Sequence, residues 1–339
     1  MNKTLNDLSD YSLTQFTTKG KSMLRKTKFD IVKSIVKSIK NNEHSYYVST
    51  ADDFPTLEKF SETGLFNAGA RLNFPAKFIR TICLNHPHLA EDVVKSRAVD
   101  YFNRLNARKD KRGSNSLFIR EFYDKVHGVL TDRYSVFDDD EVTDILSSSE
   151  YLMNAEEVWA DVSPDRFHVR FISANKLYID GDDSPLSMAV FIDNSMTGGS
   201  SLRIRFGIYR WACTNGVISG LKEFNILREV HHGKKDYVKL LNEALMEVSK
   251  YEEMMLAKVR EMANTKSSIY DMSEEDAIRY IKDKLNIGKK DAQKVFDAYT
   301  EEYGGKTKWD LCNAITFVAH NIENIEDRIH YEEYALKVA

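Results

Sequence analysis

Two stretches of the sequence carry basic residues at every second position. In the run RFHVRF, Arg166, His168 and Arg170 alternate with apolar residues, and Arg203 and Arg205 do the same in the run SLRIRF. Successive side chains of a strand point to opposite faces of a sheet, so each run places its basic groups on one face. Guanidinium groups in such a row can make bidentate contacts with phosphate or carboxylate groups. The pattern predicts a sheet with one basic face.

The four arginines of these runs are expected to point away from the side that buries the interleaved phenylalanines, valine and isoleucine. Arg120, in the alternating run SLFIREFY, is a third contributor to the face. An ordinary half-exposed strand with solvated arginines gives the same alternation. Burial of Arg203 and Arg205 in pairs with Asp161 or Asp193 would instead make them ion pairs of the scaffold, and the binding face would then be lost.

A second basic feature lies near the N-terminus. Residues 19–40 contain eight lysines or arginines and a single acid, Asp30. Isoleucines and valines recur there at helical spacing, which predicts an amphipathic helix in residues 23–40 that docks on the protein's own core. Binding to a membrane surface is the alternative. Lys26, Lys33 and Lys37 would offer point charges to phosphates without reading bases.

The elements that must position these residues fall into four segments. We expect a basic arm and amphipathic helix in residues 1–45, a helical segment in 46–112, a β-rich core in 113–233 and a helical region in 234–339. The fold class expected is α+β, with a twisted, mostly antiparallel sheet flanked by N-terminal helices and a helical C-terminal region. Leu241, Val248, Met255 and Met262 recur every seven residues. This spacing predicts one long helix that either braces the sheet or forms a homo-oligomer.

Composition describes an ordinary globular protein, with 42% hydrophobic and 29% charged residues. No apolar run approaches the roughly 20 residues that span a bilayer, and the N-terminal residues lack the apolar stretch of a secretory signal. The three cysteines are odd in number and far apart, which favours reduced core residues over a disulfide or zinc set. We therefore expect a cytoplasmic protein without a membrane partner.

The motifs of common enzymes are missing from the sequence. It contains no P-loop, no strand-linked G-x-G-x-x-G, no nucleophile elbow and no H-E-x-x-H. Asp138, Asp139 and Asp140 are a candidate divalent-metal site, but adjacent side chains do not converge on an ion without a glycine-containing loop. Acids at the start of a helix explain them better. We predict a binding protein with no catalytic residue, no cofactor and no metal.

Four motifs carry a resemblance to a known family. They are VLTDRYSVFD (residues 129–138), VFIDNSMTGG (190–199), SLRIR (201–205) and YRWACTNGVI (209–218). Their order resembles the phage/plasmid-like proteins, or domain of unknown function nine-three-two (DUF932). Met196 stands where the family has an acidic residue, which removes any role of that acid here. The resemblance runs from Pro75 to the C-terminus and implies a phage or mobile element in a bacterial host cytoplasm, without an established biochemistry.

Three functions remain open from the sequence. The first is a protein that binds or anneals single-stranded nucleic acid, DNA rather than RNA, in replication or recombination, with Tyr178, Tyr209 or Trp211 stacking on bases. The second is a phage factor that binds an acidic host protein or counters a defence system. The third is an enzyme that acts on a nucleotide or nucleic acid. For the first, the expected nucleic-acid-binding residues are Lys26, Lys33, Lys37, Arg120, Arg166, His168, Arg170, Arg203 and Arg205.

Overall fold

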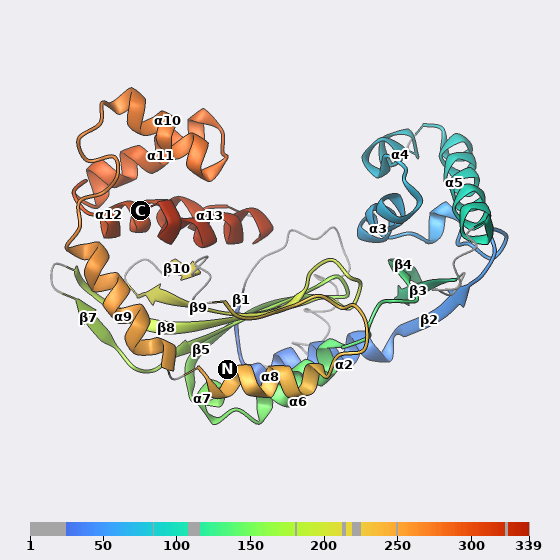
Figure 1. The fold of residues 1–339 in the computed structure, drawn as a ribbon, viewed down its shortest axis with the longest axis horizontal. Helices are drawn as coiled ribbons and strands as arrows, with labels where there is room; N and C mark the ends of the chain where they lie inside the picture. The colour runs from blue at the N-terminus through green and yellow to red at the C-terminus, as the bar shows by residue number, and fades with distance from the viewer. Residues whose placement is uncertain are drawn as a thin grey trace, which may run out of the picture.

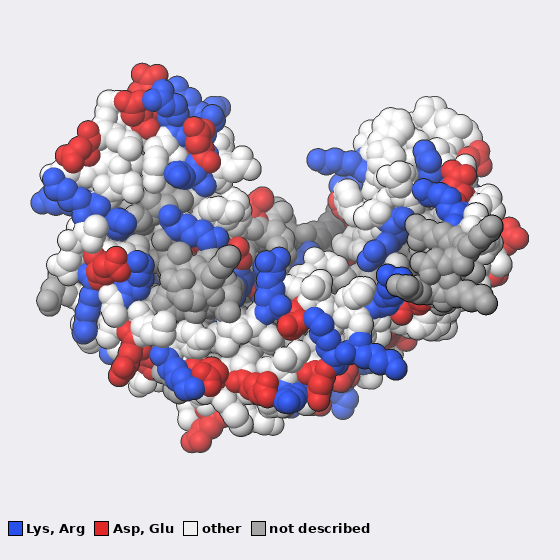
Figure 2. All heavy atoms as spheres, viewed as in Figure 1, with Lys and Arg blue, Asp and Glu red and all other residues white. Residues whose placement is uncertain are grey.

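The chain folds into a central sheet with a helical lobe above each end (Figure 1). The structure, a computed structural model, describes residues 25–83, 85–107, 116–179, 182–211, 215–218, 225–248, 250–322 and 325–338. Strands and helices occupy separate layers, and all the strand pairs within the sheets are antiparallel. The α+β class expected from the sequence is confirmed. Figure 2 shows the surface hollowed between the two lobes.

The large sheet has eight described strands in the order β1-β5-β6-β8-β9-β10, with β7 beside β8 and β11 beside β9. Its strands are β1 (Arg25–Thr27), β5 (Ala155–Ser163), β6 (Arg166–Ser173), β7 (Leu177–Ile179), β8 (Asp182–Asn194), β9 (Leu202–Arg210), β10 (Asn215–Ile218) and β11 (Asn225–Glu229). The first alternating run, RFHVRF, lies in β6, which forms a hairpin with β5 that turns around residues 163–166. The second run, SLRIRF, lies in β9 apart from its first residue.

The lower face of this sheet, as seen in Figure 1, is covered by helices, and its side chains belong to the main hydrophobic core. They are α2 (Phe29–Asn41), α6 (Asp139–Ser147), the short α7 (Glu150–Met153) and α8 (Tyr237–Met246). In α2 the buried residues Val32, Val36 and Ile39 follow the spacing of one helix face, and the ring of Phe29 lies 5.1 Å from that of Phe171. The predicted docking of the amphipathic helix on the core is therefore confirmed.

A second sheet of three strands departs from the single sheet that the sequence predicted. It contains β2 (Glu43–Val48), β3 (Leu117–Phe122) and β4 (Lys125–Thr131), and above it lie α3 (Glu62–Leu72), α4 (Ala76–Cys83) and α5 (Pro87–Ala107), with a short 3₁₀ turn η1 (Leu57–Lys59). At Gly64 a Cβ atom would stand 1.9 Å from the carbonyl oxygen of Val126, so only glycine lets α3 approach β4 this closely. Strand β2, from the N-terminal part, pairs with β3 and forms one edge of this small sheet.

The C-terminal region is helical, as expected, but its long helix is interrupted. Helix α8 ends at Met246, and α9 (Lys250–Ala263) begins after a break. The motif S-x-x-E at residues 249–252 is a helix-start signal that the seven-residue repeat concealed. Met255 and Met262 are buried in the core, which assigns the apolar stripe to internal packing. Four more helices and a π-helical turn follow, namely α10 (Glu274–Leu285), α11 (Lys289–Asp297), η3 (Ala298–Glu302), α12 (Lys308–His320) and α13 (Ile325–Val338).

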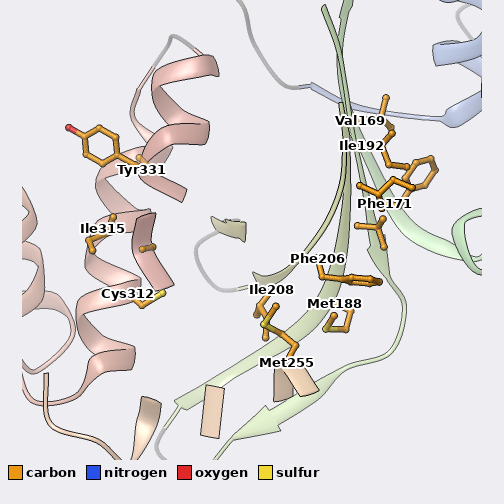
Figure 3. Packing of buried hydrophobic residues seen from close by; sticks show 14 of the residues in the cluster. Val169, Phe171, Met188, Ile192, Phe206, Ile208, Met255, Cys312, Ile315 and Tyr331 are labelled. Carbon is orange, nitrogen blue, oxygen red and sulfur yellow. The ribbon is translucent and has the colours of Figure 1, made fainter. Parts of the chain in front are cut away.

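The main core joins the lower face of the sheet to the C-terminal helices. Val169, Phe171 and Phe206 project from the strands, and Met255 of α9 packs beside Ile208 (Figure 3). A separate core fills the lobe of α3, α4 and α5. In the described parts of the chain, every helix is too short or too polar to traverse a lipid bilayer.

Candidate functional site

The upper face of the large sheet carries the arginines that the sequence singled out. Residues directly opposite one another in neighbouring strands share a face, and the register aligns them in rows across β5, β6, β8 and β9. One row is Trp159, Arg170, Phe191 and Arg205, and the next is Asp161, His168, Asp193 and Arg203. Phe167, Val169, Ile204 and Phe206 lie in the core on the other side. The predicted separation of arginines from apolar side chains is confirmed. We call this surface, with Arg166, Arg170, Arg203 and Arg205, the arginine face.

The prediction that the arginine face is exposed to solvent is wrong in this structure. Helix α13 lies over it and brings two carboxylates. Glu332 receives two hydrogen bonds from the guanidinium of Arg170, at 3.1 and 2.6 Å. Glu333 pairs with Arg205 and lies 3.6 Å from Arg203. The side chain of Arg205 is 2% exposed and that of Arg203 is 21% exposed.

Asp193 is the acidic centre of the arginine face. Its carboxylate pairs with Arg205, lies 3.5 Å from Arg203 and accepts a 2.6 Å contact from Nδ1 of His168. Burial by itself raises the pKa of Asp193, but the Arg205 charge and the His168 hydrogen bond together hold that pKa well below its usual range. Arg203 and Arg205 are therefore members of a buried ion-pair network in this conformation.

Burial has the opposite effect on the guanidinium groups. It lowers the pKa of Arg170 and of Arg205 below their ordinary values despite the nearby carboxylates. Removing these charges from water is therefore only partly compensated by Glu332 and Asp193. Arg166 is the most accessible of the set: its side chain is 28% exposed, and its Nε lies 3.3 Å from Asp161.

Arg120 does not belong to the arginine face, so this prediction is wrong. It lies in β3 of the small sheet, where its guanidinium binds Asp138 at 2.6 Å, Glu43, and the carbonyl of Met196 at 2.8 Å. These partners come from α6, β2 and the loop after β8. The buried Arg120 side chain therefore connects the two sheets. Burial by itself raises the pKa of Asp138, but hydrogen bonds from Arg120 and Lys40 and their charges hold that pKa below its ordinary value.

The basic helix is also separated from the arginine face. Because α2 covers the lower face of the sheet, its lysines cannot form one surface with the arginines above. Lys33 lies 3.6 Å from Asp144, and Lys37 is exposed. Lys26, in β1, instead stands opposite Trp159 on the upper side of the sheet and pairs with Glu157. On the side shown in Figure 2, basic and acidic residues are interspersed, without an extended basic patch. Lys33 and Lys37 therefore do not share a surface with the arginines, whereas Lys26 lies on the arginine side of the sheet.

Aromatic side chains accompany the arginines, and sequence reasoning found only some of them. Tyr209 and Trp211 have ring centroids 5.1 Å apart, and Lys176 lies over the Trp211 ring. Phe191 lies under the guanidinium of Arg170 at 5.0 Å. Phe191 belongs with Tyr209 to a small apolar cluster on the upper face, and Trp159 packs against that cluster. The missed residues, Trp159 and Phe191, share the period of the arginines across the sheet, a signal that becomes visible only with the strand register. Tyr178, in β7, is exposed.

The acidic run at the start of α6 is used by the fold. Asp138 caps the helix and pairs with Lys40 and Arg120. Asp139 accepts a 2.8 Å hydrogen bond from the amide of Asn194. Among the residues that the structure describes, no group of three or more histidine, cysteine or acidic side chains is arranged to hold a metal ion.

Comparison with known proteins gives one result. The family model described as Domain of unknown function (DUF932) matches residues 126–332, well over half of the chain. The chain belongs to this family. The DUF932 match begins in β4 and ends within α13, so it contains the arginine face and most of the helix that covers it. No curated protein and no solved structure matches the chain.

Two of the motifs that resemble DUF932 meet between the sheets. The hydroxyl of Tyr134 donates to the carbonyl of Ser195 at 2.9 Å. Asn194 connects Asp139 to His231, whose Nε2 lies 2.8 Å from the Asn194 side-chain oxygen. Met196, at the position of the family's acid, is buried and offers its carbonyl to Arg120. These contacts join buried or half-buried groups, so the motifs in this region serve the scaffold.

Proposed function

We propose that the chain binds single-stranded nucleic acid on the arginine face. The observation that carries the proposal is the row Trp159, Arg170, Phe191 and Arg205, in which aromatic and guanidinium groups alternate across four neighbouring strands. Proteins that bind single strands without strict sequence preference combine cations for the phosphates with aromatic rings on which bases stack. A sheet that presents both on one face has the chemistry needed for this function.

The charges of the sheet itself support the proposal. Arg228 of β11 stands opposite Arg203 and adds a fifth arginine to the upper face. Among the described residues of these rows two carboxylates, Asp161 and Asp193, oppose them, and Glu157 on the same side of β5 pairs with Lys26. The other neutralising groups come from α13, which is a separate element of the fold. The sheet surface alone therefore has an excess of positive charge, which favours a polyanion.

The proposal is tested by the salt dependence of binding to a labelled oligothymidylate and to the matching oligouridylate. The informative variant is Arg166→Gln/Arg203→Gln, because these side chains are the more exposed ones and their loss leaves the buried Arg205–Asp193 pair intact. Each lost phosphate contact should reduce the log–log slope of affinity against salt by about 0.7, so the pair should reduce it by about 1 to 1.5.

The matched control is Lys33→Gln/Lys37→Gln, which removes the same charge from the lower side of the molecule. It should leave the slope unchanged. An equal change in both variants would mean general attraction to a charged surface and would count against a site on the sheet. If folded wild-type protein binds neither oligonucleotide at low ionic strength, and neutralising Glu332 and Glu333 of α13 does not restore binding, the proposal fails, and an acidic host protein becomes the favoured partner.

A further inference from the structure

Helix α13 presents opposite chemistry on its two sides. Toward the sheet it places Glu332 and Glu333 on the arginines. Its other side packs with α12, and Tyr331 points away from the sheet (Figure 3). One apolar residue, Ile329, reaches the small cluster that contains Phe191 and Tyr209. The contact between α13 and the sheet therefore combines ion pairs with an apolar contact at Ile329, whereas Tyr331 and Ala335 join the helix to the main core.

Ion pairs of this kind are poorly suited to hold two parts of a protein together permanently. Replacing buried ion pairs by apolar groups of similar volume is often neutral or stabilising, so burial of charge does not by itself explain such an interface. Surfaces that separate must each be compatible with water, and interfaces between mobile parts are accordingly more polar than permanent ones. The sheet side and the helix side both meet this requirement, because each carries several charges.

The closed arrangement also leaves polar atoms of the sheet without partners. Nε of Arg203, Nε of Arg205 and the hydroxyl of Tyr209 are buried and have no hydrogen-bond partner among the described residues. A buried donor without an acceptor is unfavourable. Phosphate oxygens are acceptors that guanidinium groups bind in a bidentate manner. The arginines are thus incompletely satisfied by the two carboxylates that α13 supplies.

We propose that α13 is an intramolecular competitor of nucleic acid, in which Glu332 and Glu333 occupy the places of two phosphates. Single strands reach the arginine face only when α13 moves away together with the helices on which it packs. This inference rests on the proposed function. The affinity measured for nucleic acid is then the intrinsic affinity of the open sheet reduced by the fraction of molecules that are open.

The test compares two variants of the full chain that change the net charge equally. Glu332→Gln/Glu333→Gln weakens the contact of α13 with the arginines, whereas Glu301→Gln/Glu302→Gln alters exposed residues elsewhere in the same lobe. The first should raise the affinity for oligothymidylate by about five-fold or more, a typical size for coupling between two sites. The control should change it by less than about two-fold, since exposed distant charges are screened.

Hydrogen exchange gives an independent measurement on the wild-type protein, which decides the matter if the first variant does not fold. Saturating oligothymidylate should speed amide exchange in residues 325–338, because the displaced helix loses its packing on the sheet. Protection of these residues, or an equal gain of affinity in both variants, would overturn the competitor role. Salt-dependent binding that needs Arg166 and Arg203 would in that case still support the proposed function. If wild type and Glu332→Gln/Glu333→Gln both fail to bind, the proposed function is itself refuted.

Discussion

The two faces of the large sheet are both covered by helices but are built differently. The lower face packs phenylalanine, valine and isoleucine side chains against α2, α6 and α8 in the main core. The upper face places Arg170, Arg203 and Arg205 against the glutamates of α13, with the His168–Asp193 pair and a small apolar cluster beside them. Burial alone therefore does not separate a core from a closed interface. The chemistry of the contact distinguishes them, because apolar surfaces gain by staying together and charged surfaces remain compatible with water when apart.

The first prediction compares two phenylalanines of equal exposure, 2% each, on opposite faces: Phe171 below and Phe191 above. Phe171→Ala should lower the free energy of unfolding by about 3–5 kcal/mol, because it leaves a cavity in the main core. Phe191→Ala should have a smaller effect, limited by what closure of α13 contributes to stability. Urea denaturation measures both. Equal losses would show that the upper face is as permanent as the lower one.

The second prediction concerns the pair of Arg170 and Glu332. Arg170→Met alone should destabilise the protein, because it leaves the buried Glu332 carboxylate with Arg328 of its own helix as its remaining cationic partner. The double variant Arg170→Met/Glu332→Leu should recover this loss and exceed the wild type by up to about 4 kcal/mol. The midpoint of urea denaturation is the measurement. If the double variant is as unstable as the single one, the ion pair stabilises the folded protein, and the idea that this interface is unfavourable is wrong.

The third prediction uses the polar exception on the lower face, where Asn194 contacts Asp139. Burial raises the pKa of Asp139 to about 7, whereas the pKa of an aspartate in an unfolded chain is about 4. At a pH between these two pKa values, Asp139 is protonated in the folded protein and ionised in the unfolded chain. Its contribution to the free energy of unfolding therefore falls as the pH rises through this window.

The side chain introduced by Asp139→Asn cannot ionise. The decrease in the free energy of unfolding with rising pH that comes from this position should therefore disappear. At pH 8 the variant should be more stable than the wild type by about 1–3 kcal/mol, the size expected for an unpaired buried polar group. Thermal or urea unfolding of both proteins at pH 5 and pH 8 gives the difference. A variant that is less stable than the wild type at pH 8 would show that the ionised carboxylate is favourable in its place.

Local sequence pattern determined which side of the sheet each residue occupies. The period of two in RFHVRF and SLRIRF placed the arginines on one face and Phe167, Val169, Ile204 and Phe206 on the other, as the strands confirm. Helical spacing in the same way predicted the docking of α2. These predictions succeed because side-chain direction follows from backbone geometry within a few residues.

The tertiary structure alone decided what covers each face. Arg170 meets Glu332 across 162 positions of the chain, and Arg120 meets Glu43 across 77. No spacing within a strand reports on partners so distant, and the same alternation serves a solvated face, a ligand site or a buried interface equally well. The position of α2 below the sheet, away from the arginines, was likewise decided by tertiary packing and not by local spacing. Strand periodicity fixes the direction of a side chain, whereas its burial depends on which remote element gains most by packing against it.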